Sequence, residues 1–87
     1  MDNTQRELSF GEKAVGLNFN PGNDPKVQEV KESYAKIIDT LNDEREKLSH
    51  GDESTGESRE KIRMISIAIT ELQTSQMWAV KAITYRA

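Results

Sequence analysis

The sequence predicts an all-α protein, an antiparallel helical hairpin with an N-terminal arm and loop that assembles into a compact homo-oligomer. Two long segments with helical spacing of apolar residues, joined by a short polar stretch, predict the hairpin. The second segment is apolar over more of its surface than one partner helix can cover, which predicts the oligomer. We expect one domain over residues 1–87, with the arm and loop in 1–24, helices in 25–49 and 59–86, and a turn in 50–58.

Composition restricts the classes of function. Charged residues make up 31% and hydrophobic residues 34% of the 87-residue chain, and its formal net charge is −3. A chain with this charge is a poor candidate for tracking duplex DNA, which requires a strong basic patch. There is no cysteine, and the single histidine, His50, cannot form a zinc site alone. No apolar run is long enough to span a membrane and no secretory signal is present, so we expect a protein of the bacterial cytoplasm.

The N-terminal region combines turn-forming residues with apolar ones. Its first twelve residues favour a short helix or an arm, and Lys13 to Asp24 reads as a loop because it contains Gly16, Pro21 and Gly22. The same loop carries Val15, Leu17 and Phe19. Such a segment either packs over a helical core or forms a ligand-binding loop, since loops on rigid helices often carry function.

The first long helix has a clear start. Asp24 suits the N-cap position and Pro25 the first helical position, where its missing N–H costs nothing. Apolar residues then recur at spacings of three and four as far as Leu41, which is typical of an amphipathic helix. Asp39, Asp43, Glu44 and Glu46 are interspersed with basic residues, a pattern that favours a solvated helix face over paired catalytic carboxylates or a metal site.

The second long helix has more than one apolar stripe. Ser54, in a capping box with Glu57, and Ser58 are both candidate N-caps. One stripe should face the first helix; it contains Ile62, Ile65, Ile69, Leu72, Gln76, Ala79 and Ile83. A second line includes Met64 and Trp78, and a third holds Ile67 and Met77. Only other subunits can cover these additional lines, so we expect an oligomer with closed symmetry.

The residues favour binding over catalysis. No Cys or His pair offers a nucleophile and base, because His50 stands alone in the polar turn, and no Gly-rich phosphate loop appears, so we expect no enzyme, cofactor or metal. Lys81 lies within the apolar stretch QMWAVKAIT, near Thr74, Thr84 and Trp78. Its ammonium either reaches solvent along a bent stem or meets an anionic ligand, such as a small nucleotide, beside the hydroxyls and the aromatic ring.

The segment LQTSQMWAVKAI, from Leu72 to Ile83, resembles the closing helix of the phage anti-CBASS cyclic-oligonucleotide sponge family, whose members carry a similar LQT…MW…(R/K)AI signature. The loop at 19–21 and the following Val27…Lys31 helix are also similar, and the resemblance extends over Asp24–Tyr85. It implies helical hairpins that assemble into hexamers in the cytoplasm of the host bacterium. Such hexamers sequester cyclic di- and trinucleotides without cleaving them and so block CBASS signalling.

The same resemblance implies two kinds of pocket. Lys81 matches the basic residue of the trinucleotide pockets, although lysine in place of arginine loses a bidentate phosphate grip. The dinucleotide pockets use an N-terminal aromatic residue and a lysine of the first long helix. Phe10 or Phe19 is the candidate for stacking on a base, and Lys26 or Lys31 is the candidate for a phosphate.

One competing interpretation is an oligomeric adaptor or structural phage protein that binds another protein through a surface at Met77 and Trp78. A nucleotide-processing enzyme is another, which the lack of a metal cluster and of a base–nucleophile pair disfavours.

Overall fold

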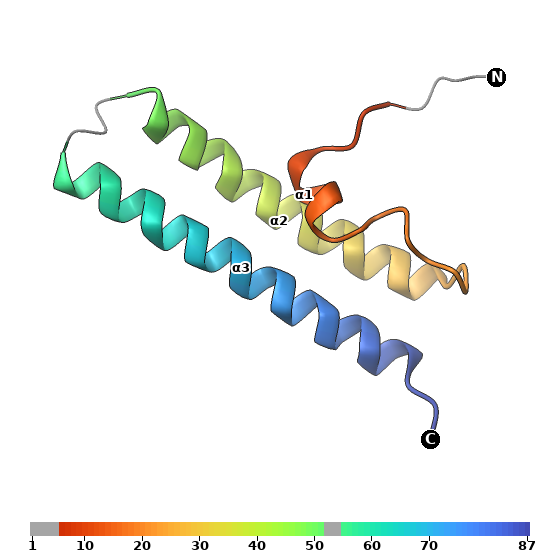
Figure 1. The fold of residues 1–87 in the computed structure, drawn as a ribbon. Helices are drawn as coiled ribbons and strands as arrows, with labels where there is room; N and C mark the ends of the chain where they lie inside the picture. The colour runs from red at the N-terminus through yellow and green to blue at the C-terminus, as the bar shows by residue number, and fades with distance from the viewer. Residues whose placement is uncertain (1–5, 52–54) are drawn as a thin grey trace.

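The computed structural model describes residues 6–51 and 55–87, and it confirms the all-α helical hairpin (Figure 1). Three helices follow one another along the chain: α1 (Phe10–Ala14), α2 (Pro25–Ser49) and α3 (Gly56–Thr84). The long helices α2 and α3 lie side by side, and the short α1 lies against α2 (Figure 1). Among the described residues, no helix is long and apolar enough to cross a lipid bilayer.

Local capping chemistry explains where the long helices begin. Asp24 is the N-cap of α2 and accepts a hydrogen bond from the backbone N–H of Lys26 at 2.9 Å, with Pro25 in the first turn. The N-cap of α3 is Thr55, whose hydroxyl accepts from the N–H of Ser58 at 3.0 Å. The expectation that Ser58 caps α3 is therefore wrong, because Ser58 already lies within the first turn. The alternative cap, Ser54, lies outside the described residues.

α3 also ends earlier than the expected range of 59–86. Its last residue is Thr84, because Tyr85 leaves the helical conformation with φ −63° and ψ 133°. The residues after α3 therefore turn away from the helix axis. This places Arg86 beside the start of α2, which matters for the site described below.

The hydrophobic core forms where α1 and its following loop cover the hairpin. Buried residues from all three segments meet there: Val15, Leu17, Ala35, Ile38 and Ile69. Leu8, Tyr34, Leu41, Ile65 and Leu72 pack around them. The N-terminal region therefore docks onto the core through Val15 and Leu17, whereas Phe19, two residues further on, is 72% exposed.

A carboxylate on α2 attaches α1 to the hairpin. Asp39 accepts hydrogen bonds from the Ser9 hydroxyl and from the Gly11 N–H, both at 2.6 Å. The approach is close enough that a Cβ at Gly11 would lie 2.2 Å from the carbonyl oxygen of Ala35. Asp39 was expected on a solvated face, and this expectation is wrong: the sequence pattern of α2 alone does not reveal the N-terminal segment that covers it.

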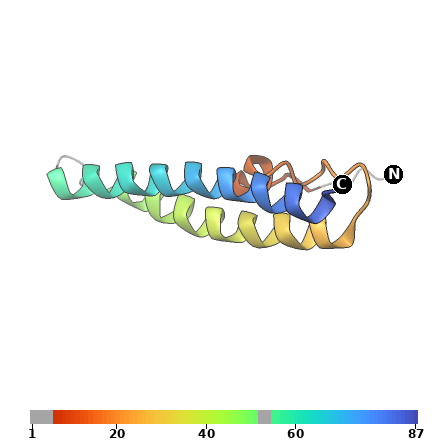
Figure 2. The same ribbon diagram turned by 90° about the horizontal axis from the view of Figure 1, so that it is seen from below.

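Much of the remaining apolar surface of the hairpin has no cover within the chain. The large exposed apolar side chains of the two long helices are Ile37, Met64, Ile67, Met77 and Trp78, and Tyr85 is exposed directly after α3. On α3, the residues classed as buried are Ile69 and Gln76, both on the stripe that was expected to face α2. Figure 2 shows why: the two long helices form a shallow layer, with α1 against one part of it. The outer surface of α3 therefore remains apolar and open.

Candidate functional site

Local backbone hydrogen bonds define the conformation of the loop that follows α1. Gly16 has a φ of +64°, a left-handed conformation that favours glycine. The N–H of Gly16 donates to the Lys13 carbonyl at 3.1 Å, and the N–H of Leu17 donates to the Glu12 carbonyl at 3.0 Å. This pair of bonds ends α1 in a Schellman motif and turns Leu17 into the core. The chain is thereby directed back toward the start of α2.

The ammonium group of Lys31, on α2, donates hydrogen bonds to the backbone of the same loop. Its Nζ donates to the carbonyl oxygens of Gly16 at 2.9 Å and of Phe19 at 2.5 Å. The residue is only 5% exposed, and burial lowers the pKa of its ammonium group. The Nζ also lies 5.6 Å from the centre of the Phe19 ring, within the range of a cation–π contact. One buried cation thus fixes both the loop backbone and the position of the aromatic residue.

Asparagines complete the connection from Phe19 to α2. The Asn20 side chain donates to the Asp24 carbonyl at 3.0 Å and accepts from the Asp24 N–H at 3.2 Å. The N–H of Asn23 donates to the Asn20 carbonyl at 2.9 Å, and Asn23 itself has a φ of +51°. Asparagine tolerates this conformation better than most residues. The loop is therefore braced at both ends, with the Phe19 side chain left outside.

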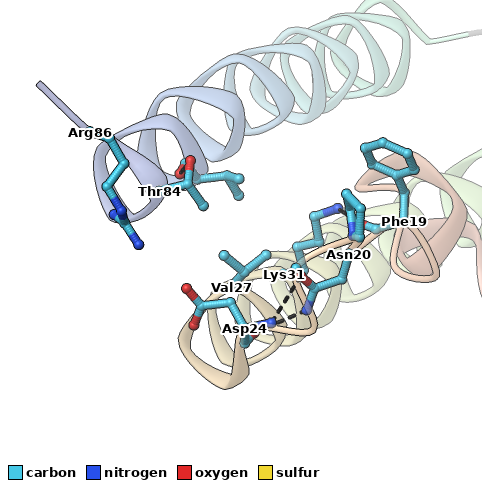
Figure 3. Close-up of a pocket in the computed structure, with 10 residues that line it drawn as sticks. Phe19, Asn20, Asp24, Val27, Lys31, Thr84 and Arg86 are labelled. Atoms are coloured by element: carbon cyan, nitrogen blue, oxygen red, sulfur yellow. Dashed lines mark hydrogen bonds between the residues drawn. The ribbon is translucent and has the colours of Figure 1, made fainter.

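A cavity of about 540 Å³ lies between this loop, the first turns of α2 and the end of α3 (Figure 3). Its lining comprises Phe19, Asn20, Pro21, Gly22, Asp24, Val27, Lys31, Val80, Thr84 and Arg86. Ligand pockets commonly combine an apolar lining with a few polar groups in this way. The cavity brings together three of the residues singled out from the sequence, namely Phe19, Lys31 and Thr84.

The alternative candidates for this pocket lie elsewhere. Lys26 is exposed on the first turn of α2, where its ammonium pairs with Glu29 at 3.0 Å. Phe10 begins α1, and its ring lies 5.5 Å from the guanidinium of Arg45. Neither residue lines the cavity, so the structure separates these two from Phe19 and Lys31.

Thr74, Trp78 and Lys81 form a second group, on the outer side of α3. Their spacing of four and three residues places them on one helix face, and all three are exposed. The Thr74 hydroxyl donates to the Thr70 carbonyl at 3.3 Å, and Lys81 makes no ion pair with the described residues. Trp78 is 67% exposed, in the middle of the open apolar surface. Thr84 lies about one turn beyond Lys81 and lines the cavity, whereas Thr74, Trp78 and Lys81 do not.

Sequence reasoning missed three polar residues of the cavity: Asn20, Asp24 as a lining residue, and Arg86. The asparagines near Pro21 gave a turn signal, but not the direction of the loop. A cation near the C-terminal end of a helix offsets the helix dipole, so the position of Arg86 in the sequence does not by itself indicate a binding role. Among the described residues, no group of acidic or histidine side chains could hold a metal ion, and the cavity lining contains no such group either.

The fold and the cavity define a class of protein: a helical hairpin whose N-terminal loop encloses a small cavity against both long helices. Residues 12–84 match the family model of the Acb2/Tad1 hairpin domain. The chain therefore belongs to this family, the anti-CBASS sponge family, whose members bind cyclic oligonucleotides and which is a binding family rather than an enzyme family. No curated protein and no solved structure matches the chain.

Proposed function

We propose that this protein sequesters cyclic di- and trinucleotides in the cytoplasm of a host bacterium, without cleaving them, and so blocks CBASS antiphage signalling. One observation carries the proposal: the cavity at the open end of the hairpin combines the exposed Phe19 ring with the cationic side chains of Lys31 and Arg86. Stacking of a base on an aromatic ring contributes about 1–3 kcal/mol. Cations nearby then balance the negative charge of the phosphates.

The outer face of α3 supports a second, trinucleotide-binding site. Lys81 and Trp78 share this face, and neither is covered by the rest of the chain. We propose that subunits of a homo-oligomer, a hexamer by analogy with the family, meet over Met77 and Trp78, so that Lys81 and Thr74 lie at the edge of the interface. Ligands bound there would contact more than one subunit, which would couple ligand binding to assembly.

The test is a thermal-shift measurement with a panel of cyclic di- and trinucleotides, followed by heating and identification of the released ligand. A ligand that binds only the folded protein adds about 2.7 kcal/mol to its stability at 100 times its Kd. We expect a raised Tm and recovery of the intact ring. Recovery of a linear product would show catalysis and contradict sequestration.

Two variants assign the ligand classes. Lys81→Glu should abolish binding of trinucleotides and leave the oligomer intact, whereas Lys61→Glu, at the other end of the same helix, should bind normally. Normal binding of every ligand by Lys81→Glu would remove Lys81 from the site.

A protein-binding adaptor is the second candidate function, and the exposure of Met77 and Trp78 favours it. No nucleotide of the panel would then raise the Tm. The two functions are therefore separated by the same measurement.

A further inference from the structure

The donors of Lys31 are largely committed within the chain. An ammonium group has three N–H donors, and two of those of Lys31 are used by the carbonyls of Gly16 and Phe19. A phosphate that took these donors would remove the printed hydrogen bond of the Phe19 carbonyl and one of the two hydrogen bonds of the Gly16 carbonyl, which also accepts from the Phe19 N–H at 2.9 Å. Lys31 is thus suited to holding the loop, and the ligand anion needs another partner.

Arg86 lies across the cavity from the loop (Figure 3). Its side chain is exposed, and its single hydrogen bond within the described residues runs from Nη1 to the carbonyl oxygen of Tyr85 at 3.0 Å. No ion pair joins it to a carboxylate of those residues. A guanidinium has five N–H donors in a planar arrangement that matches two phosphate oxygens at once. Most of these donors remain available to a ligand.

The other polar groups of the cavity are less suited to an anion. The Thr84 hydroxyl donates to the Val80 carbonyl at 2.9 Å, so its proton is already used. The Asp24 carboxylate would repel a phosphate, and it accepts from the Lys26 N–H at the N-cap. An anion in the cavity is therefore favoured at the Arg86 guanidinium rather than at the Thr84 hydroxyl or the Asp24 carboxylate.

We propose that Arg86 supplies the phosphate contact in this cavity, whereas Lys31 is a positioning residue that fixes the loop beneath Phe19. The ligand then lies between two elements: a base stacks on the Phe19 ring, and a phosphate contacts the end of α3. This assignment rests on the proposed function, because it concerns how a cyclic dinucleotide is held in the same cavity.

The first test measures Kd for cyclic di-AMP, cyclic di-GMP and the mixed guanine–adenine ring by calorimetry. Arg86→Ala should weaken binding about 10- to 100-fold, as expected for the loss of hydrogen bonds to a charged group. Arg86→Lys should keep part of the affinity, because it retains the charge and loses the bidentate geometry. Arg63→Ala is the matched control: Arg63 is exposed on α3 and pairs with Glu60, away from the cavity. It should bind as the unchanged protein does.

The second test separates positioning from direct contact at Lys31. Lys31→Met should accelerate hydrogen exchange of the Leu17 and Phe19 amides in the absence of any ligand, and it should also weaken binding. If Lys31 acts through Phe19, the double variant Phe19→Ala/Lys31→Met should bind no more weakly than Phe19→Ala alone. Weaker binding by Lys31→Met with unchanged amide exchange would overturn the assignment, because Lys31 would then contact the ligand itself.

The outcomes separate the assignment of Arg86 from the proposed function. If the unchanged protein binds a cyclic dinucleotide and Arg86→Ala binds it equally well, the assignment of Arg86 is wrong and the proposed function stands. If the unchanged protein binds none of the three rings, dinucleotide capture and the assignment fall together.

Discussion

The two long helices of the hairpin differ in how the chain covers their apolar residues. α2 is covered by α3 on one side and by α1 with its loop on another, so that Val27, Lys31, Ala35 and Ile38 are all buried. α3 has α2 along its stripe, and Met64, Ile67 and Trp78 remain exposed. Both helices are amphipathic, but α1 packs chiefly against α2.

This difference predicts that residues of α2 determine the stability of one chain and that exposed residues of α3 determine its assembly. The core around Ile38 forms within one chain, whereas several large apolar side chains of α3 are left exposed by the described residues. Exposed apolar patches of this kind mark association sites. We therefore expect substitutions on α2 to change the free energy of unfolding at any protein concentration, and substitutions on the outer face of α3 to act through association.

A matched pair of isoleucines tests this separation most strongly. Ile38 is fully buried, and Ile38→Ala should lower the free energy of unfolding by about 2–5 kcal/mol, because it leaves a cavity in a packed core. Ile67 is 45% exposed, and Ile67→Ala should cost far less in dilute solution. Urea denaturation at two protein concentrations measures both effects. Equal losses in dilute solution would contradict the comparison, since Ile67 would then belong to the core of the single chain.

Trp78→Ala should have the next largest effect, on assembly. An aromatic residue at the centre of an interface typically contributes at least about 2 kcal/mol to association. We expect a lower mass by sedimentation and a Tm that no longer rises with protein concentration. Glu46→Ala is the control, because Glu46 is an exposed and charged residue of the other long helix, α2. A Trp78→Ala variant that keeps the native mass would remove this residue from the interface.

Periodicity and caps made the hairpin predictable. The Asp24–Pro25 pair indicated the start of α2, and the stripe through Ile69 and Gln76 indicated the buried side of α3. A further signal was present and unused: Ser9 and Glu12 have the spacing of a capping box, and the structure forms both of its bonds at the start of α1. Local sequence patterns therefore predicted most of the fold.

The site was less predictable, because it depends on contacts between distant segments. No sequence pattern indicates that the ammonium of Lys31 meets the carbonyls of Gly16 and Phe19, or that Asp39 accepts from Gly11. Both contacts follow from how the loop closes over α2. The sequence showed which residue types were present, but it did not predict which distant backbone groups they would hydrogen-bond.

Gly11→Ala should detach α1 from α2 and lower the free energy of unfolding by less than Ile38→Ala does. The new Cβ would lie 2.2 Å from the Ala35 carbonyl oxygen and 2.8 Å from Oδ1 of Asp39, so α1 must move away. Crowding of this kind typically costs about 1–3 kcal/mol. Gly22→Ala is the matched control, because nothing lies within 4 Å of the corresponding position. Thermal denaturation of both variants checks the result, and equal Tm values would contradict the tight contact between α1 and α2.

The smallest expected effect is the pH dependence of the stability that Glu12 gives to α1. Glu12 accepts hydrogen bonds from Arg6 at 2.7 Å and from the Ser9 N–H at 2.9 Å, and these lower its pKa from 4.5 to about 2. The charged carboxylate is thus favoured in the folded state. Its contribution to stability is fully present above pH 4.5 and is lost as the pH falls toward 2. Because the Arg6–Glu12 pair is at the surface, salt should weaken it.

Comparison with Glu12→Gln isolates this carboxylate from the other acidic groups, including Glu60, whose pKa the hydrogen bond from Arg63 also lowers. At pH 6 the unchanged protein should have the higher Tm, and the difference should shrink steadily and vanish near pH 2. Amide exchange should place the loss in α1, because Glu12 closes the capping box there and not in the hairpin. A difference in Tm that is the same at pH 6 and pH 2 would show that the charge of Glu12 does not hold the cover in place, and that Asp39 and the buried Val15 and Leu17 attach α1 without it.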